Sequence, residues 1–382
     1  MTFEAKERCF INQELDRLQT EGLTVTRKLT YSDVGVDRDL RVESKKALRM
    51  LKRTYRHSRY GKVVELPYGN IFPFHDRYLD LAIEGVGTKV LVAQLAGEYD
   101  TIGIDGVAMA VNDVIRSGAR PIAVADNIHA QVSDPSLVRE WIRGISKAAA
   151  ESECVVPSGE IGDVADIIKG LYAGEGFDMV FAAIGEVAKE DVISGRNINP
   201  GDPIIGLKSS GLHSNGISLA RRVLFRQWGG KYEADAVPAG LERELVREVL
   251  EPTRIYVKSF LGLTERLNVK AAVHITGDAY LKFGRLAKSS QGIGFEFNNF
   301  KQQPVFDVLQ RTASELKSPI TDKEMFRTFN MGWGFAVILE KPDADKALDI
   351  LSSLGVESEQ IGNVTSSRGI RIFHNGKKII LG

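Results

Sequence analysis

The sequence predicts an α/β (α+β) protein of two domains, and three observations support that prediction. The chain has 382 residues, whereas a single domain usually takes ~100 to 200. From about Tyr78 onward, short apolar runs typical of strands alternate with longer segments of helical periodicity. The densest cluster of turn-forming residues, at 199–203, is followed by a second set of strands and helices. We therefore expect one domain over residues 31–198 and another over residues 199–382.

The expected elements follow in chain order. Residues 3–20 have apolar side chains at helical spacing, which predicts a helix within an N-terminal extension over residues 1–30. Residues 44–56 predict a strongly basic helix with Leu48 and Leu51 on its buried side, whose basic side is either a solvated face or a cationic wall near a polyphosphate. In the first domain we expect strands at 78–83, 122–125 and 179–187, and helices at 106–117 and 135–150. In the second we expect strands at 203–207, 271–275, 294–297 and 335–339, and a helix from about residue 217.

Composition limits the classes of partner. Acidic and basic residues number 50 each, so the formal net charge is zero, which argues against a general nucleic-acid or membrane surface. The first 20 residues carry charges throughout, and no later segment supplies the ~20 apolar residues of a membrane span. The cysteines, Cys9 and Cys154, are too few for a disulfide framework. We expect a cytoplasmic protein that binds neither nucleic acid nor membrane.

Phosphate-binding chemistry is concentrated in residues 209–216, S-S-G-L-H-S-N-G, between an apolar run and an expected helix. Glycines and hydroxyls let backbone N–H groups approach an anion, and the first turn of the helix adds unpaired donors at the positive end of its dipole. A polar strand-to-helix turn would use the same residue types. The loop alone leaves both interpretations open.

A second candidate, residues 84–89 with the sequence E-G-V-G-T-K, combines a carboxylate, two glycines, a hydroxyl and a cation. Such oxygen ligands hold magnesium and lysine neutralises phosphate, although the Walker-A spacing is absent. Downstream, Asp105 and Asn112 are seven residues apart on an expected helix, hence on one face and ~10 Å apart. That separation suits several ions along a polyphosphate, or a metal and another ligand. Asp105 could equally be a helix N-cap.

Three further segments give weaker signals. Glu160 follows a short apolar run and could place a carboxylate in a cleft. His274 ends a strand in H-I-T-G-D, where a structural histidine is the commoner case. Arg327 lies in R-T-F-N-M-G-W-G, which core packing and a turn also explain.

Taken in order with Y-S-D-V-G-V-D at residues 31–37, these segments resemble the aminoimidazole ribonucleotide synthetase family, the phosphoribosylformylglycinamidine cyclo-ligases of purine synthesis. The matching segments are G-V-G-T-K, T-I-G-I-D with V-N-D, S-S-G-L-H-S-N-G, H-I-T-G and R-T-F-N-M-G-W-G, over roughly residues 31–340. The resemblance implies a homodimer whose N-terminal domains pair their sheets into a barrel, with a C-terminal α/β domain folded against each. It also implies ATP, Mg²⁺ and a small ribonucleotide substrate.

The family's chemistry is ATP-dependent phosphorylation of the formyl oxygen of formylglycinamidine ribonucleotide, followed by displacement of phosphate by a ring-closing nitrogen. The resemblance implies Mg²⁺ near Glu84 and Asp105, and catalytic roles for Lys89 and for His213 or His274, between which the sequence does not decide. It implies nucleotide contacts at Gly85, Gly87, Thr88, Lys89, Asp105 and Asn112. It implies substrate contacts at Glu160, Ser210, His213, Ser214, Asn215 and Arg327. We expect substitutions of Lys89 or Asp105 to slow the chemical step much more than they disturb folding.

Three departures from the family pattern leave alternatives open. Glu84 replaces an aspartate, S-G-E-I-G-D-V around Glu160 replaces G-G-E-T-A-E-M-P, and Asp278 and Ala279 replace glycines after H-I-T-G. Asp278 puts a negative charge where a phosphate is expected. The alternatives are a diverged relative that phosphorylates another small substrate, and a dimeric nucleotide-binding module without turnover.

Overall fold

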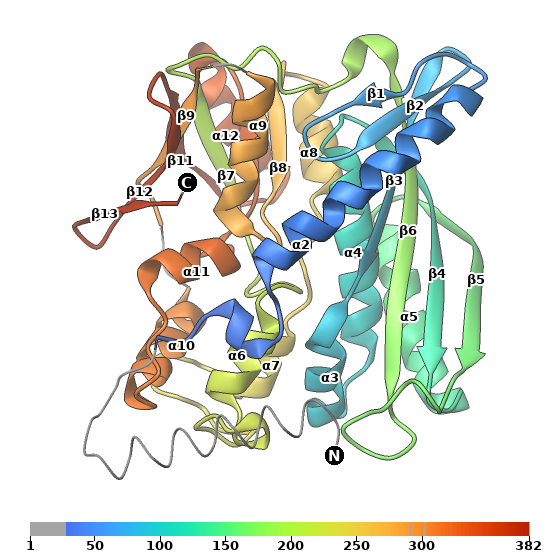
Figure 1. Ribbon diagram of the computed structural model, residues 1–382, viewed down its shortest axis with the longest axis vertical. Helices are drawn as coiled ribbons and strands as arrows, with labels where there is room; N and C mark the ends of the chain where they lie inside the picture. Colours follow the sequence, from blue (N-terminus) through green and yellow to red (C-terminus); the bar gives the residue numbers. More distant parts are fainter. Residues whose placement is uncertain (1–27, 291, 301–302, 382) are drawn as a thin grey trace.

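The computed structural model describes residues 28–290, 292–300 and 303–381. The helix expected at 3–20, and nearly all of the extension over residues 1–30, lie outside the described residues. Two sheets form in succession along the chain, six-stranded and then seven-stranded, with helices packed on both (Figure 1). The expected α/β architecture with two sheet-containing domains is confirmed.

The first sheet has the strand order β1-β2-β3-β6-β4-β5, and only its β4–β5 pair is parallel. Helices α4 and α5 pack on one face of this sheet, so the side chains of β6 alternate between buried and half-buried. The strands are β1 (Val64–Glu65), β2 (Asn70–Phe74), β3 (Arg77–Gly85), β4 (Arg120–Ala130), β5 (Val155–Asp163) and β6 (Phe177–Ala188). The helices are α3 (Val90–Ala96), α4 (Asp100–Ile115) and α5 (Pro135–Glu151).

The opposite face of strands β3, β6, β4 and β5, which we call the open face, carries exposed apolar side chains such as Leu81 and Val155. At β1 and β2 the 3₁₀ helix η2 (Lys45–His57) contacts Glu65 and Asn70 on that side of the sheet. The rows of cross-strand neighbours on the open face include Leu81, Ile184, Ala123 and Val155, in that order across four strands. Ile83, one pleat along, is 63% exposed. An apolar sheet face of this kind is typical of a surface that another chain covers.

The second sheet has the order β13-β12-β9-β11-β7-β10-β8 and is antiparallel except for β9–β12. Its strands are β7 (Pro203–Lys208), β8 (Ala271–His274), β9 (Gly294–Phe297), β10 (Trp333–Ile338), β11 (Ser358–Thr365), β12 (Gly369–His374) and β13 (Lys377–Ile380). Its helices are α6 (Ile217–Leu224), α7 (Leu245–Leu250), α8 (Val257–Thr264), α9 (Phe283–Ser289), α10 (Pro304–Glu315), α11 (Asp322–Thr328) and α12 (Ala344–Ser353). No described helix is both long and apolar enough to cross a membrane.

The basic helix expected at 44–56 is the continuation of α2 (Arg38–Ser44) into the 3₁₀ helix η2 (Lys45–His57), and it runs diagonally across Figure 1. The expectation that Leu48 and Leu51 are buried is wrong for the described chain, since they are 56% and 57% exposed. Polar contacts hold the helix to the first sheet, including the ion pair of Lys52, in the middle of η2, with Glu65 at 2.6 Å. No described element covers these two leucines.

Helix α4 begins at Asp100, earlier than the expected residue 106. The N-cap interpretation of Asp105 is therefore wrong, because Asp105 lies in the second turn and is fully buried. The helix is buried on nearly all sides because the first sheet and α5 pack on one side and α8 on the other. It forms the seam between the two domains and carries the candidate site.

Candidate functional site

The Asp105 carboxylate joins three motif segments that are distant in sequence. Its Oδ1 accepts hydrogen bonds from Lys89 Nζ at 2.9 Å and from Ser214 Oγ at 3.0 Å. The backbone N–H and the hydroxyl of Thr253 donate to the same oxygen at 2.8 and 2.6 Å. Lys89 Nζ lies 2.8 Å from Oδ2 and also donates to the Glu251 carbonyl at 2.6 Å. The G-V-G-T-K segment, α4 and the S-S-G-L-H-S-N-G loop thus converge, as the family resemblance implies.

Burial lowers the pKa of Lys89, and the charge of Asp105 opposes that change. Both side chains have no exposed surface. The two side chains are paired and enclosed, so neither is exposed to a ligand in this structure. The role of Lys89 and Asp105 at a nucleotide stays a prediction.

Asn112 lies two turns after Asp105 on the same face of α4, as its spacing predicts. Its Oδ1 accepts from the Tyr256 backbone N–H at 2.9 Å, and its Nδ2 donates to the Arg254 carbonyl at 2.8 Å. Asp105 and Asn112 therefore bind one segment of the second domain, residues 253–256. In this structure both side chains hold the domains together.

The last residue of the S-S-G-L-H-S-N-G loop, Gly216, has a left-handed backbone conformation and packs closely against Phe329. Gly216 has φ 76°, and a Cβ there would lie 2.2 Å from Phe329 Cε1, so the position requires glycine. Helix α6 starts at the next residue, and Thr88 Oγ1 lies 2.9 Å from Ser218 Oγ in its first turn. The G-V-G-T-K segment thus contacts the N-terminus of α6, where unpaired backbone donors favour an anion.

His213 is fully buried within this loop. Its Nε2 accepts from the Ser210 backbone N–H at 3.2 Å, and its Nδ1 has no hydrogen-bond partner in the part of the chain that the structure describes. Burial, together with the charges of His274 and Lys89, holds the pKa of His213 well below its usual value. The imidazole is therefore neutral.

His274, at the end of β8, belongs to a second cluster. This cluster is centred on Asp113, the residue that follows Asn112 on α4. Its Nδ1 lies 2.8 Å from Asp113 Oδ1, and Arg116 Nη2 lies 2.9 Å from Asp113 Oδ2. Burial opposes ionisation of Asp113, but Arg116, His274 and Lys282 outweigh it and hold its pKa well below the usual value. Burial lowers the pKa of His274 to about 4, although the hydrogen bond and charge of Asp113 oppose that shift.

Glu84 lies with this second cluster. Burial, and then the charge of Asp113, raise its pKa to about 7. Lys282 donates from Nζ to the His274 carbonyl at 3.0 Å and to the Thr276 hydroxyl, and burial lowers its pKa to about 8. Glu84 is thus grouped with Asp113, whereas Asp105 is bound by Lys89, Ser214 and Thr253.

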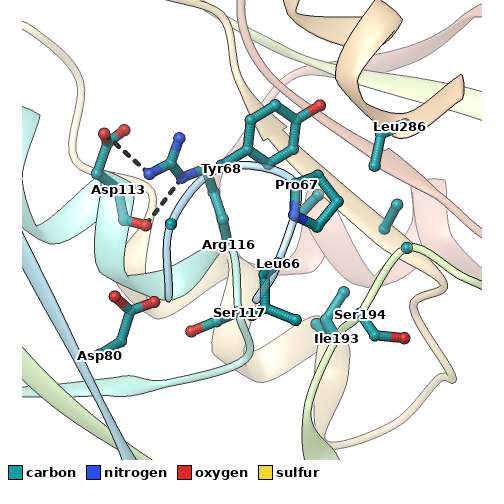
Figure 2. Close-up of a pocket in the computed structure, with 14 residues that line it drawn as sticks. Leu66, Pro67, Tyr68, Asp80, Asp113, Arg116, Ser117, Ile193, Ser194 and Leu286 are labelled. Atoms are coloured by element: carbon teal, nitrogen blue, oxygen red, sulfur yellow. Dashed lines mark hydrogen bonds and ion pairs between the residues drawn. The ribbon is translucent and has the colours of Figure 1, made fainter. Parts of the chain in front are cut away.

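The loop at residues 66–69 and Asp113 line the same small cavity, which also borders Asp80 and Arg116 (Figure 2). The Arg116 guanidinium lies 5.2 Å from the centre of the Tyr68 ring, and the Tyr68 hydroxyl donates to the Lys282 carbonyl at 3.2 Å. A cavity of about 20 Å³, roughly one water molecule, remains beside Asp80. The loop holds Arg116, and through it the orientation of the Asp113 carboxylate.

Comparison with known proteins identifies the family. The model of the AIR synthase related protein, N-terminal domain, matches residues 71–187, and that of the C-terminal domain matches residues 199–375. The chain belongs to the AIR synthase related family. Phosphoribosylformylglycinamidine cyclo-ligase of Pyrococcus furiosus is 38% identical, over 92% of this chain and 100% of the relative. The cyclo-ligase of Methanocaldococcus jannaschii is 36% identical, over 92% of this chain and 95% of the relative.

Solved structures resemble the AIR synthase related fold at low identity. HypE of E. coli, a hydrogenase maturation protein, has a TM-score of 0.55 at 16% identity, over 80% of this chain and 85% of that one. PurL of T. maritima, complexed with ADP, has a TM-score of 0.53 at 15% identity, over 85% of this chain and 46% of that one. These likenesses establish the fold alone.

Glu160 and Arg327 lie apart from the two buried clusters of this AIR synthase related chain. Glu160 is exposed on edge strand β5 and pairs with Asn127, in the row of the open face that also holds Val180 and Gly85. Arg327 lies in the last turn of α11, and its Nε is buried without a hydrogen-bond partner among residues 28–290, 292–300 and 303–381.

Several residues of the two clusters along α4 were not singled out by the sequence analysis. Asp113 directly follows Asn112 in V-N-D, and that motif could have indicated it. Thr253 and Tyr256 had no comparable signal, because each binds a residue of α4 that is far away in the chain. Lys282 binds the nearby His274 and Thr276, and no motif singled it out.

The side chains present suit Mg²⁺ in part. Glu84 and Asp113 are neighbouring carboxylates, and a divalent cation would relieve their repulsion. Mg²⁺ commonly binds one or two carboxylates and otherwise substrate phosphates and water. Among the described residues, no group of three or more His, Cys, Asp or Glu side chains could hold a metal. A magnesium ion here would therefore depend on phosphate ligands.

Proposed function

We propose that this chain is an ATP-dependent cyclo-ligase that converts formylglycinamidine ribonucleotide to aminoimidazole ribonucleotide in purine biosynthesis. The observation that carries the proposal is the 38% identity to a curated cyclo-ligase over that protein's whole length. The convergence of the motif segments on α4 supports it. These observations favour the cyclo-ligase over a kinase of another small substrate and over a module without turnover.

The proposed nucleotide site includes residues 85–89 and the N-terminus of α6, with Asp105 and Asn112 behind them. Glu84 would hold Mg²⁺ together with Asp113 or, if Lys89 moves away, with Asp105. Bound Mg²⁺ would offset the negative charge of the transferred phosphoryl group. The site lies at the seam between the proposed domains, residues 31–198 and 199–382, so their closure would position the two substrates.

The proposed base is His274. Ring closure requires that the attacking nitrogen lose a proton as it displaces phosphate from the activated formyl carbon. Asp113 is an acceptor when ionised, so Nδ1 of His274 carries the hydrogen and Nε2 keeps its lone pair. Nε2 is buried without a partner among the described residues. His213 is the weaker candidate because no carboxylate orients its ring.

The proposed assembly is a cytoplasmic homodimer in which two open faces meet. Pairing would cover Leu81 and Ile83 and would enclose the row that contains Glu160. Glu160 could then contact the ribonucleotide within the shared barrel, while Ser210, Ser214, Asn215 and Arg327 act from the second domain. This arrangement explains why an exposed edge-strand carboxylate could belong to the substrate site.

The deciding assay supplies formylglycinamidine ribonucleotide, ATP and Mg²⁺, and it measures ADP and aminoimidazole ribonucleotide together. We expect both products in equal amounts. ATP binding without substrate-dependent ADP release would support a module without turnover. ADP release with a different acceptor alone would support a diverged kinase.

A further inference from the structure

Asp278, which replaces a glycine of the family pattern, lies in a turn with unusual backbone. Its φ is 72° and that of Ala279 is 39°, both in the left-handed region. Aspartate tolerates this region better than most residues, whereas alanine adopts it rarely. The preceding Gly277 touches the phosphate loop, since a Cβ there would lie 3.1 Å from Asn215 Oδ1. The turn therefore places a carboxylate near the proposed anion site.

Two guanidinium groups face that carboxylate. Arg38 Nε lies 3.8 Å from Asp278 Oδ1, and Arg285 Nη2 lies 3.9 Å from Oδ2. The Arg38 side chain is 12% exposed, whereas that of Arg285 is 41% exposed. Arg38 is therefore the less screened partner. It comes from the first turn of α2, far from Asp278 in the sequence.

Arg38 also binds the end of α11. Its Nη1 donates to Glu324 Oε1 at 2.8 Å. Its Nη2 donates to the Arg327 carbonyl at 3.0 Å and to the Thr328 hydroxyl at 2.7 Å. These bonds fix the turn that carries Arg327, whose own Nε has no hydrogen-bond partner within the described chain.

Tyr31 completes the connection. Its backbone N–H donates to Glu324 Oε1 at 3.1 Å, and its ring centre lies 5.1 Å from the Arg38 guanidinium. The segment that Tyr31 opens, η1 (Tyr31–Val34), packs on α6. The Gly216 backbone at the start of α6 opposes the rise that burial causes in the pKa of the Tyr31 hydroxyl. Residues 31–38 thus contact the phosphate loop, the turn at Asp278 and the last turn of α11.

We propose that Arg38 is a positioning residue that compensates Asp278 and fixes Arg327, so that the turn after His274 and the end of α11 together accept the phosphate of an anionic ribonucleotide. This inference rests on the proposed function. Without Arg38, the Asp278 carboxylate would repel the phosphate and the Arg327 turn would lose three hydrogen bonds. A residue that merely joined the domains would affect stability without a specific effect on ribonucleotide binding.

The test uses the full-length enzyme and four variants: Arg38→Met, Arg38→Lys, Asp278→Asn and the double variant Arg38→Met/Asp278→Asn. The KM for formylglycinamidine ribonucleotide, the KM for ATP, kcat and thermal stability are measured for each. We expect Arg38→Met to raise the ribonucleotide KM about tenfold and to change the ATP KM less than about twofold. We expect the double variant to recover at least about threefold of that loss, because the uncompensated charge is gone.

Arg38→Lys keeps the charge but not the fork of donors, so an intermediate KM is expected. If Arg38→Met does not fold, Arg38→Lys with and without Asp278→Asn tests the same coupling. Arg226→Met, in the exposed pair with Glu233, is the matched control and should leave both KM values unchanged. A fall in thermal stability with an unchanged ribonucleotide KM, or no recovery on removing Asp278, overturns the proposal. Absence of turnover in the unsubstituted enzyme overturns the proposed function and this inference together.

Discussion

Nδ1 of His274 lies 2.8 Å from Oδ1 of Asp113, and the other ring nitrogen of the histidine has no hydrogen-bond partner among the described residues. Arg116 holds the second oxygen of the same carboxylate at 2.9 Å. The carboxylate therefore has one arrangement, and it selects one tautomer and one orientation of the imidazole. This is the geometry of an oriented general base.

Asp113→Asn should lower kcat by about 10² to 10⁴-fold, because an amide can donate to Nδ1 and so move the hydrogen to Nε2. His274→Gln should cause a similar loss. Residues that act as one unit give non-additive losses. The double variant should therefore be little worse than either single one in steady-state assays of aminoimidazole ribonucleotide formation.

Asp134→Asn is a suitable control because this exposed N-cap of α5 can be replaced by asparagine. It should retain full activity. Losses that multiply in the Asp113/His274 double variant would show that the two residues act independently and would contradict the dyad.

The buried pair of Lys89 and Asp105 leads to a second prediction. Lys89→Met leaves the Asp105 carboxylate in the seam without its cation, and breaking a buried pair in this way costs about 3 to 5 kcal/mol. We expect a loss of this size in urea unfolding, and partial recovery when Asp105→Asn is added. This prediction revises the expectation from the sequence that substitutions of Lys89 disturb folding little, because the structure buries the pair completely.

Lys231→Met is the matched control, since Lys231 and Glu315 form an exposed pair. Its effect on the free energy of unfolding should be negligible beside that of Lys89→Met. Equal unfolding free energies for Lys89→Met and the unsubstituted enzyme would contradict the structural role of the pair.

Helix periodicity predicts that Asp105 and Asn112 share a face, and the structure confirms it. Their partners Thr253 and Tyr256 lie 148 and 144 residues downstream, and no local pattern encodes such a contact. Similarly, alternation along β3 puts Glu84 and Asp80 on the inner face. Only the packing of α4 on that face decides that Glu84 meets Asp113.

Two glycines explain why the sequence predicts the start of α4 too late, at residue 106 instead of Asp100. Glycine is unfavourable inside a helix, yet Gly103 and Gly106 both lie inside α4. A Cβ at Gly103 would lie 2.5 Å from the Trp141 carbonyl, and one at Gly106 would lie 1.9 Å from Phe181 Cε2. These glycines permit close packing on α5 and β6, and a single sequence does not distinguish that use from a turn.

The open face leads to a third prediction. Ile83→Asp places a charge at the centre of the proposed dimer interface, so it should convert the dimer to a monomer in light scattering after size exclusion. Enzymatic activity should fall as well, because in the monomer the partner subunit would no longer enclose the row of open-face residues that contains Glu160. Val237→Asp changes another exposed apolar residue away from this sheet and serves as the control. A dimeric Ile83→Asp variant would contradict pairing through the open face.

Asp80, beside the cavity of Figure 2, gives a pH-dependent prediction. Burial raises its pKa to about 6, although a hydrogen bond from Ser117 and the charge of Arg116 oppose the shift. A folded-state pKa above the unfolded value of 3.8 means that ionised Asp80 destabilises the fold. The penalty grows as the pH rises from about 4 to about 6 and is constant above that.

Asp80→Asn should therefore stabilise the protein by about 2 to 3 kcal/mol at pH 7.5 and by less than about 1 kcal/mol at pH 4. Urea unfolding of both proteins at the two pH values measures the difference. The amide has nearly the size and shape of the carboxylate, so the substitution removes the charge and changes the packing little. A gain that is equal at both pH values would mean that something other than the ionisation of Asp80 is responsible, and a loss at pH 7.5 would mean that the carboxylate is stabilised by its surroundings.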